Sequence, residues 1–339
     1  MSAPTIKDVA KLAGVSISTV SRVMNESKPV SPESRRKVLD AIKKLDFKPN
    51  ELARSLVMRK SNMIGVIVKD IGISYMAQII RGIEEIGRMY NYDILLSSTY
   101  GDIEVEHKII EFMCTKQVEG IIMISEKINP EILFKLKSKN IPFVRLDKFY
   151  EYTDEHTVSI DYKSTCNKMT NYLVDEGHKS IVFISEDVTS RIGREKLAGF
   201  NEAVAERKVK SALINAKDIT VQTGYDMGEE IFKLIKDNKS TVVFASEDSL
   251  AIGFISYCYD NGLKVPQDIS VAGFGDDLIA SIYRPALTTI EEPYYDMGAI
   301  SMRKLIKELR NEEKLKDVTI LPSRIVERGS VATFKKKNK

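Results

Sequence analysis

The chain of 339 residues contains no tryptophan, only three cysteines and only three histidines. The cysteines are odd in number and far apart in the sequence, at Cys114, Cys166 and Cys258. This pattern excludes a disulfide framework, and we expect reduced, buried thiols. The histidines are His107, His156 and His178, and they lack the spacing of metal ligands. We therefore expect neither a metal site nor a cofactor.

Long apolar runs and catalytic motifs are missing as well. No stretch of about 18 uninterrupted apolar residues occurs, and the N-terminus lacks the pattern of an export signal, so we expect a cytoplasmic protein. There is no P-loop lysine pattern and no Gly-x-Ser-x-Gly elbow. Gly273 and Gly275 follow a predicted strand, but the third glycine of a dinucleotide-binding turn is absent. We therefore expect that the chain is not an enzyme.

Helical signals begin close to the N-terminus. Thr5 with Asp8 three residues later has the form of a capping box, and Gly14 allows the tight turn that separates two helices. Ser16 is expected to cap the second helix. Apolar residues recur at helical spacing and would pack the pair together: Ile6, Val9, Ala10, Leu12, Ala13, Val15, Val20 and Val23. The segment is typical of a helix-turn-helix DNA-binding module.

The same part of the chain is basic. Residues 1–60 contain 13 Lys and Arg against 6 Asp and Glu, whereas the remaining residues contain 38 against 42. Neutralisation of DNA phosphates requires such a basic headpiece. Arg22 is the best candidate for reading a base, because its guanidinium can donate two hydrogen bonds to one guanine edge. The residues expected to contact DNA here are Thr5, Ser16, Ile17, Ser18, Thr19, Ser21, Arg22 and Asn25.

A third helix is predicted to begin at Ser31-Pro32. Its buried stripe would consist of Val38, Leu39, Ile42 and Leu45. Pro49-Asn50 then opens a helix too short to be stable alone in water, which we expect to fold only when DNA or a partner holds it. This part of the chain thus divides into a headpiece at 1–48 and a hinge helix with linker at 49–61.

From Met63 onward, short apolar runs alternate with amphipathic helices, which predicts parallel α/β sheets. Strands are predicted at 63–68, 93–97, 120–125, 143–146, 181–185, 241–246 and 269–273. Helices are predicted at 76–90, 104–116, 162–176, 194–207, 224–236 and 249–261. Residues 62–339 exceed the usual size of one domain, so we expect two similar lobes, followed by a basic tail at 335–339.

The segments Val15-Ser16, Thr19–Asn25, Pro49-Asn50 and Ala53–Leu56 resemble signatures of the LacI family of bacterial repressors, and the resemblance extends over the whole chain. It implies that the second helix lies in the major groove of DNA and that a hinge helix lies in the minor groove. There Leu56 would wedge into the central base step, with Asn50 and Ala53 beside it. The resemblance also implies a homodimer on a near-palindromic operator in double-stranded DNA.

The family resemblance further implies a core like that of periplasmic binding proteins, in which the chain crosses between lobes near Asp161, Pro293 and Pro322. The N-lobe would contain about 62–161 and 292–321, and the C-lobe about 162–291 and 322–334. The expected fold class is therefore an all-α helix-turn-helix headpiece followed by an α/β two-lobed core with parallel sheets.

The cleft between the lobes is the usual place for a small effector in such a core. Sugar- and purine-responsive relatives have there an Arg before Leu-Ala-Gly-aromatic, an Asn before Asp, and an Asp after Gly-aromatic. This sequence instead has Lys196, Glu247 and Gly275, which argues against a conventional sugar effector. The candidate effector cleft for a small-molecule coeffector consists of Asp70, Tyr75, Arg191 and Asp276, for which ordinary surface and lobe-closure contacts are the alternative.

The segment Tyr294–Arg310 predicts a helix with two different faces. One narrow stripe contains Gly298, Met302, Leu305, Ile306 and Leu309, and the far side contains Asp296, Ile300, Arg303 and Lys307. An apolar residue between two cations could dock a partner that carries an apolar spot and a phosphate, although the pattern alone favours a solvated face.

This helix resembles the carbon-catabolite-control branch of the LacI family, as do Arg81–Ile86, Lys116–Ile122 and Val158–Tyr162. The resemblance implies that the helix binds the phosphocarrier HPr in its serine-phosphorylated form, as corepressor. The contacts would be Tyr295, Asp296, Ala299, Ile300, Met302, Arg303 and Lys307, with Arg303 and Lys307 nearest the phosphoserine. We therefore expect an HPr-dependent regulator, mainly a repressor. The alternative is a local repressor of a carbohydrate operon that a sugar or sugar phosphate releases.

Overall fold

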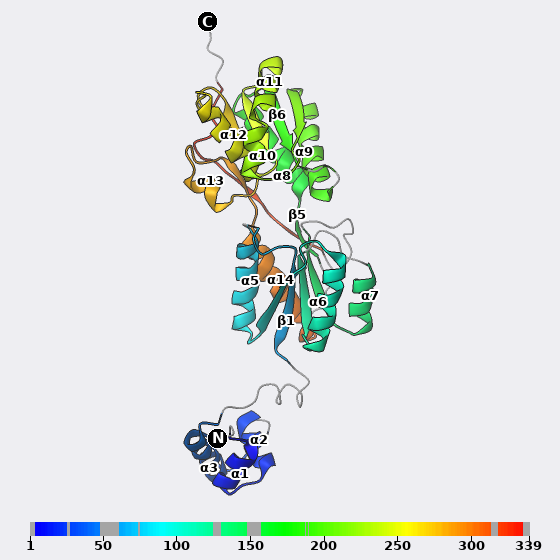
Figure 1. The fold of residues 1–339 in the computed structure, drawn as a ribbon, viewed down its shortest axis with the longest axis vertical. Helices are drawn as coiled ribbons and strands as arrows, with labels where there is room; N and C mark the ends of the chain where they lie inside the picture. The colour runs from blue at the N-terminus through cyan, green and yellow to red at the C-terminus, as the bar shows by residue number, and fades with distance from the viewer. Residues whose placement is uncertain are drawn as a thin grey trace. The chain divides into compact units, whose positions relative to one another are not determined.

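The computed structural model describes residues 4–25, 28–47, 61–73, 75–124, 130–147, 157–186, 188, 190–312 and 318–334. The chain divides into two compact units, Met1–Ser61 and Asn62–Lys339 (Figure 1). Among the described residues, no helix is both long enough and apolar enough to cross a membrane.

The first unit consists of three helices, α1 (Ile6–Ala13), α2 (Ile17–Asn25) and α3 (Pro32–Leu45). The carboxylate of Asp8 accepts hydrogen bonds from the backbone amide of Thr5 at 2.8 Å and from its hydroxyl at 2.7 Å. Gly14 ends α1 in the left-handed region with a φ of 67°, and the Ser16 hydroxyl accepts from the Thr19 amide. The predicted helix-turn-helix is thus confirmed, with its cap and its turn.

A small apolar core joins these helices, with one fully buried valine from each: Val9, Val20 and Val38. Two predictions of burial were wrong, since Leu12 is 50% exposed and Leu39 is 51% exposed. On α3 the buried neighbour of Val38 is Ala41, three residues further on. Residues three apart share a helix face, whereas the adjacent Leu39 is rotated away from the core.

The N-terminal half of the second unit is built on a parallel sheet of β1 (Met63–Val68), β2 (Asp93–Ser98), β3 (Gly120–Ile124), β4 (Phe143–Asp147), β5 (Thr157–Ile160) and β11 (Thr319–Leu321). Its strand order is β11-β5-β4-β3-β1-β2. The helices are α5 (Met76–Met89), α6 (Ile103–Thr115), α7 (Pro130–Ser138) and α14 (Tyr294–Leu309). Figure 1 shows α5 and α14 on one side of this sheet and α6 and α7 on the other. The continuous apolar runs of β1 and β3 suit such burial on both faces.

The C-terminal half has a second parallel sheet of β6 (Ser180–Ser185), β7 (Lys210–Asn215), β8 (Val242–Ala245) and β9 (Ser270–Ala272), in the order β7-β6-β8-β9. Its helices are α8 (Tyr162–Asp175), α9 (Arg191–Arg207), α10 (Val221–Asp226), α11 (Gly228–Asn238), α12 (Asp248–Asp260) and α13 (Leu278–Ile282). Side chains of α8 and α9 pack on one face of the sheet, and those of α11 and α12 pack on the other. The predicted fold class, a helical headpiece and a two-lobed core with parallel sheets, is confirmed.

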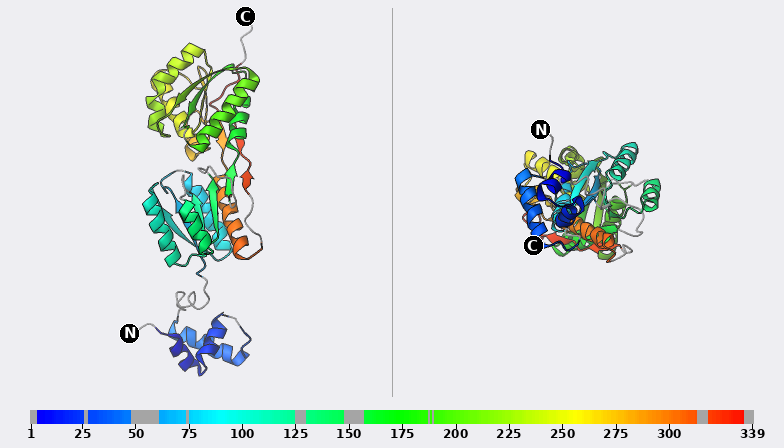
Figure 2. Two further views of the ribbon diagram at one scale, coloured as in Figure 1. Left: turned by 90° about the vertical axis from the view of Figure 1, so that its right-hand side faces the viewer. Right: turned by 90° about the horizontal axis from the view of Figure 1, so that it is seen from below.

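The two halves of the second unit are joined by three segments (Figure 2). One follows β5 at Asp161, and the other two run through β10 (Thr289–Glu291) and β12 (Arg324–Val326), which pair antiparallel. Beside them, the hydroxyls of Thr165 and Ser323 lie 2.6 Å apart. These crossings bring the start of α14 close to the ends of the C-terminal strands.

Some predicted boundaries were wrong. The single helix predicted at 224–236 is two helices, α10 and α11, which meet at Met227. At the start of α11, a Cβ on Gly228 would lie 2.1 Å from the Tyr257 ring, so α11 packs closely against α12 there. The helix predicted from position 194 begins earlier, at Arg191, where the Ser190 hydroxyl accepts from the amide of Gly193 at 3.0 Å.

Candidate functional sites

The N-terminus of α2 gathers three hydroxyl groups. The Ser16 oxygen lies 2.8 Å from that of Ser18 and 2.9 Å from that of Thr19. Helix N-termini and hydroxyl side chains are common phosphate contacts in protein–DNA complexes. The Thr5 hydroxyl, by contrast, is engaged with Asp8. This end of α2 therefore has the groups that can hold a phosphate.

Further along α2, Ile17 is 45% exposed and Arg22 is exposed. Arg22 has no hydrogen bond or ion pair with another residue in the described part of the chain, so its guanidinium is available to a base edge. Thr19 and Ser21 are partly exposed. The other predicted contacts, Asn50, Ala53, Leu56 and the side chain of Asn25, lie outside the described residues.

The surface of this unit is strongly basic. Every described Lys and Arg of the headpiece is exposed: Lys7, Lys11, Arg22, Lys28, Arg35, Arg36, Lys37, Lys43 and Lys44. The described acidic residues are fewer, namely Asp8, Glu33, Asp40 and Asp46. Such an excess of exposed cations is what binding to the phosphate backbone requires.

In the second unit, a buried lysine lies at the carboxyl ends of β6 and β8, the usual position of ligand sites in open α/β sheets. Lys196 of α9 is 1% exposed, and its Nζ lies 2.8 Å from Glu186 Oε1 and 3.0 Å from Glu247 Oε1. The same ammonium donates a hydrogen bond to the carbonyl oxygen of Ser246 at 2.8 Å. Glu186 follows β6 directly, and Glu247 precedes α12. Two residues that replace the polar groups of sugar-responsive relatives are thus paired with each other.

Aromatic rings and a third carboxylate complete this group. The Lys196 ammonium lies 4.1 Å from the centroid of the Phe274 ring and 5.8 Å from that of Tyr162. Burial alone would lower the pKa of Lys196, but the carboxylates of Glu186, Glu247 and Glu292 outweigh burial and raise it. Lys196 therefore stays charged inside the protein. These residues form the Lys196 cluster, which consists of Lys196, Glu186, Glu247, Glu292, Phe274 and Tyr162.

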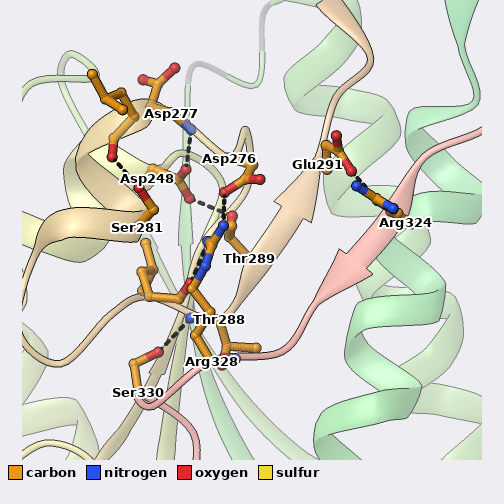
Figure 3. A network of polar contacts seen from close by, with 12 residues as sticks. Asp248, Asp276, Asp277, Ser281, Thr288, Thr289, Glu291, Arg324, Arg328 and Ser330 are labelled. Atoms are coloured by element: carbon orange, nitrogen blue, oxygen red, sulfur yellow. Dashed lines mark hydrogen bonds and ion pairs between the residues drawn. The ribbon is translucent and has the colours of Figure 1, made fainter.

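A second polar network surrounds Asp248, the first residue of α12 (Figure 3). Its carboxylate accepts from the Thr289 hydroxyl at 2.5 Å and from the Asp277 amide at 2.9 Å. Burial dominates over these hydrogen bonds and raises the pKa of Asp248 to about 7. The carboxylate also occupies the space beside Gly273, where a Cβ would lie 2.2 Å from Asp248 Oδ1. This network fixes the loop that follows β9.

Gly275 lies in the same loop, at the position where sugar-responsive relatives have Asp. Its φ of 133° lies in the region that favours glycine, so a side chain there would strain the backbone. The backbone conformation of this loop therefore favours the glycine that replaces the Asp of these relatives.

The four residues of the candidate effector cleft each have an internal contact. Asp70 accepts from the Gly72 amide at 2.8 Å, and the Tyr75 ring stacks on Tyr294 with centroids 4.9 Å apart. Arg191 pairs with Glu195 at 2.8 Å, and Asp276 pairs with Arg328 at 2.7 Å. Figure 3 shows the Asp276–Arg328 pair beside Asp248. Each of these four contacts lies within one half of the second unit.

Helix α14 has the two faces that the sequence predicts. Asp296, Arg303 and Lys307 are exposed, Tyr295 is 36% exposed and Ile300 is partly exposed. Two residues expected at the corepressor surface are buried instead, Ala299 at 3% and Met302 at 0% exposure. Met302 belongs to the stripe that faces the sheet, and Ala299 faces α5. The outward surface of α14 is therefore narrower than predicted.

The buried edge of α14 lies directly against α5. A Cβ on Gly298 would lie 2.0 Å from the Ile79 carbonyl oxygen, and one on Gly82 would lie 2.2 Å from the Tyr295 carbonyl oxygen. Across this contact, the Tyr295 hydroxyl donates to Glu85 at 2.8 Å, and Glu85 also pairs with Arg81. The surface beside Arg303 is thus shared by two helices.

A third buried titratable group lies in the C-terminal half. His178 is 1% exposed, with Nδ1 at 2.7 Å from the Thr241 hydroxyl and its ring stacked on Phe334 at 6.0 Å between centroids. Burial lowers the pKa of His178 to about 4. Its spacing was expected to exclude a metal role, and its contacts are those of a neutral core histidine.

The fold and the exposed basic headpiece define a DNA-binding transcriptional regulator with a two-lobed core. Residues 5–50 match the family described as "Bacterial regulatory proteins, lacI family", and residues 170–331 match "Periplasmic binding protein-like domain". Catabolite control protein A of Priestia megaterium is 36% identical over 329 residues, which cover 96% of this chain and 98% of that protein. The HTH-type transcriptional regulator RegA of Clostridium saccharobutylicum is 37% identical over 332 residues, which cover 97% and 99%. The chain belongs to the LacI family and is a transcriptional regulator close to these two proteins.

Solved structures agree with this assignment. A lac repressor dimer bound to operator and the anti-inducer ONPF matches with a TM-score of 0.87 and 24% identity, covering 98% of this chain and 100% of that one. The transcription regulator CcpA of Lactococcus lactis matches with a TM-score of 0.69 and 28% identity, covering 79% and 98%. Both matches support the fold of this chain.

Sequence reasoning did not find Glu186, Glu292 or Tyr294 as members of a polar site. Lys196 and Glu247 were noticed only as departures from a family pattern. Their opposite charges were a usable signal, because Glu247 places an anion where relatives have Asn, and an anion near the cation Lys196 indicates an internal ion pair.

Proposed function

We propose that this chain is a homodimeric regulator of carbon catabolite control, mainly a repressor, which binds near-palindromic operators with serine-phosphorylated HPr as corepressor. The observation that carries the proposal is the outward surface of α14, where Arg303 and Lys307 are exposed beside the partly exposed Ile300. Cations bind a phosphoserine through charge-assisted hydrogen bonds, and an apolar residue beside them adds buried area. The proposed contacts are Tyr295, Asp296, Ile300, Arg303 and Lys307.

The similarity to catabolite control protein A supports the choice of partner, and the headpiece supports the choice of target. In the proposed complex, α2 lies in the major groove with Arg22 at a base edge, and residues 49–61 form the hinge between headpiece and core. The protein acts in the cytoplasm and has no catalytic activity of its own. Residues 62–161 with 292–321 and residues 162–291 with 322–334 serve as its two lobes.

Exposed apolar residues of α13 are the proposed dimer contact. Leu278 is 76% exposed and Ile282 is 62% exposed, while Ile279 of the same helix is 37% exposed. Isolated exposed apolar residues are common, but one leucine and two isoleucines on one short helix form a patch that a second copy can bury. A twofold dimer presents two headpieces, which a palindromic operator requires.

The corepressor would act by population shift. Serine-phosphorylated HPr favours the lobe arrangement in which the two hinge helices can fold on DNA, so its binding and operator binding strengthen each other. Reciprocity follows: operator DNA must raise the affinity for the corepressor by the same factor.

The test is operator affinity of the purified dimer at fixed salt, with and without serine-phosphorylated HPr, for wild type and Arg303→Glu. Arg303→Glu should abolish the stimulation and leave basal DNA affinity unchanged, because α14 does not belong to the headpiece. Lys233→Glu, which makes the same charge reversal at an exposed position on α11, is the matched control and should keep full stimulation. Equal stimulation of Arg303→Glu and wild type would refute the assignment. Release from the operator by a sugar or sugar phosphate, without any response to HPr, would instead establish a local repressor.

A further inference from the structure

The Lys196 cluster contains the elements of a site that recognises a primary ammonium group. Carboxylates of Glu186 and Glu247 lie within 3.0 Å of the nitrogen, and the carbonyl oxygen of Ser246 accepts a third contact. The ring of Phe274 lies 4.1 Å away, which is the geometry of a cation–π interaction. Such a combination of aromatic faces and carboxylates is how proteins bind ligand ammonium groups.

The charges of this cluster are unequal. Three glutamates, Glu186, Glu247 and Glu292, act on a single ammonium, and all four side chains are buried or nearly so. Buried carboxylates require a cation, because removing one partner of a buried pair leaves an uncompensated charge. An anionic or neutral sugar would have to displace Lys196 and leave these carboxylates without it. The chemistry of the site therefore selects a cation.

We propose that the Lys196 cluster is a primary-ammonium binding site occupied by the protein's own lysine, which stands in place of a diffusible effector. The lysine is tethered by α9, so the site is filled in every copy of the protein. A regulator with this site does not need a small molecule in the C-terminal half to hold the ends of β6 and β8 together.

The cluster also reaches the proposed corepressor helix. Glu292 accepts a hydrogen bond from the hydroxyl of Tyr294, the first residue of α14, and the Tyr294 ring stacks on Tyr75 just before α5. The backbone amide of Glu292 also donates to the carbonyl oxygen of Gly275. Glu292, whose charge acts on Lys196, thereby links the Lys196 cluster to the start of α14. This coupling rests on the proposed function, whereas the ammonium site itself does not.

The experiment removes the lysine and supplies the missing part in solution. Lys196→Ala deletes a propylammonium fragment, so n-propylammonium chloride is the probe and 1-propanol, of nearly the same shape but without charge, is the control at matched ionic strength. Thermal unfolding and calorimetric titration are measured for Lys196→Ala and wild type. Lys163→Ala is the matched variant, because Lys163 also pairs with a glutamate, Glu202 at 3.0 Å, but is 49% exposed.

We expect propylammonium to raise the melting temperature of Lys196→Ala saturably and to bind at least about tenfold more tightly than propanol, since hydrogen bonds between charged groups are the stronger ones. Wild type and Lys163→Ala should not respond. Equal stabilisation by propanol would mean an ordinary apolar cavity and would overturn the proposal, as would a folded variant that ignores both compounds. If Lys196→Ala does not fold alone, its refolding yield is compared in propylammonium and in propanol. A higher yield in propylammonium supports the proposal, and equal yields overturn it.

Measurements of operator binding with serine-phosphorylated HPr test the link between the Lys196 cluster and α14 separately from the proposed function. If wild type responds to the corepressor, Lys196→Ala should respond less, and propylammonium should restore the response. A wild type that ignores the corepressor would end the proposed function but would leave the amine result intact. Full corepressor response in Lys196→Ala without amine would overturn the coupling.

Discussion

Two buried groups should make opposite contributions to the pH dependence of folding stability. The pKa of Asp248 is raised by burial to about 7, and the pKa of His178 is lowered by burial to about 4. Between pH 4 and 6.5 the folded protein keeps a proton on Asp248 that the unfolded chain has lost, so stability falls as pH rises. Over the same range the unfolded chain holds a proton on His178 that the folded protein lacks, so stability rises with pH.

The magnitudes follow from the differences in pKa. Each pKa unit corresponds to about 1.4 kcal/mol. The pKa of Asp248 is 3.8 in the unfolded chain, so the group contributes about 4 kcal/mol to the free energy of unfolding. This contribution is fully present below pH 3.8 and is lost by pH 7. His178, with a reference value of 6.5, contributes about 3 kcal/mol with the opposite sign between pH 6.5 and 4. In wild type the two slopes therefore cancel between pH 4 and 6.5.

Asp248→Asn and His178→Gln expose the two slopes separately. The free energy of unfolding of the second unit is measured by urea denaturation from pH 4 to 7.5, and the wild-type value is subtracted at each pH. The difference for Asp248→Asn should rise with pH by about 1.4 kcal/mol per unit, and that for His178→Gln should fall by a similar amount up to pH 6.5. A constant offset is expected in each variant, because each loses a hydrogen bond. Asp237→Asn, at an exposed position on α11, controls for the amide substitution.

Differences that do not change with pH in both variants would refute this reasoning. They would mean that folding changes the pKa of neither group. If the stability difference for Asp248→Asn instead fell with pH, the hydrogen bonds of Asp248 with Thr289 and Asp277 would outweigh burial and lower its pKa.

Three further predictions concern packing, DNA and assembly. Gly298→Ala should cost about 1–3 kcal/mol despite the better helix propensity of alanine, because the new Cβ meets the Ile79 carbonyl oxygen at 2.0 Å; unchanged urea stability would contradict the α5–α14 contact. Arg22→Ala should weaken operator binding by about 1–3 kcal/mol in titrations that compare operator with scrambled DNA, and an undiminished preference for operator would exclude base reading by this residue. Replacing both Leu278 and Ile282 by Glu should yield monomers in sedimentation experiments, whereas a persistent dimer would place the dimer contact elsewhere.

Local signals in the sequence were sufficient for the headpiece helices. The Thr5–Asp8 cap, the turn at Gly14 and the start of α3 at Ser31-Pro32 depend on residues at most three positions apart, and all three were predicted correctly. The exposed position of Leu39 was missed, because the buried face of α3 is determined by its packing against α1 and α2 and not by α3 alone.

The contacts within the core could not be predicted in the same way. Lys196 and Glu247 are 51 positions apart, and only the parallel order of β6 and β8 brings them together. The outward face of α14 was predicted from its periodicity, whereas Ala299 was expected at the corepressor surface from the family resemblance and is buried. Periodicity identifies the face toward the sheet, whereas the side toward α5 is determined by the close approach at Gly82 and Gly298.

The most direct test of the account is the affinity of the purified dimer for a palindromic operator with a central CG step, at fixed salt, with and without serine-phosphorylated HPr. Unphosphorylated HPr and candidate sugars are the controls. We predict tighter operator binding with the phosphorylated carrier alone, and loss of that gain in Arg303→Glu. Indifference to the phosphorylated carrier, together with release by a sugar, would contradict it.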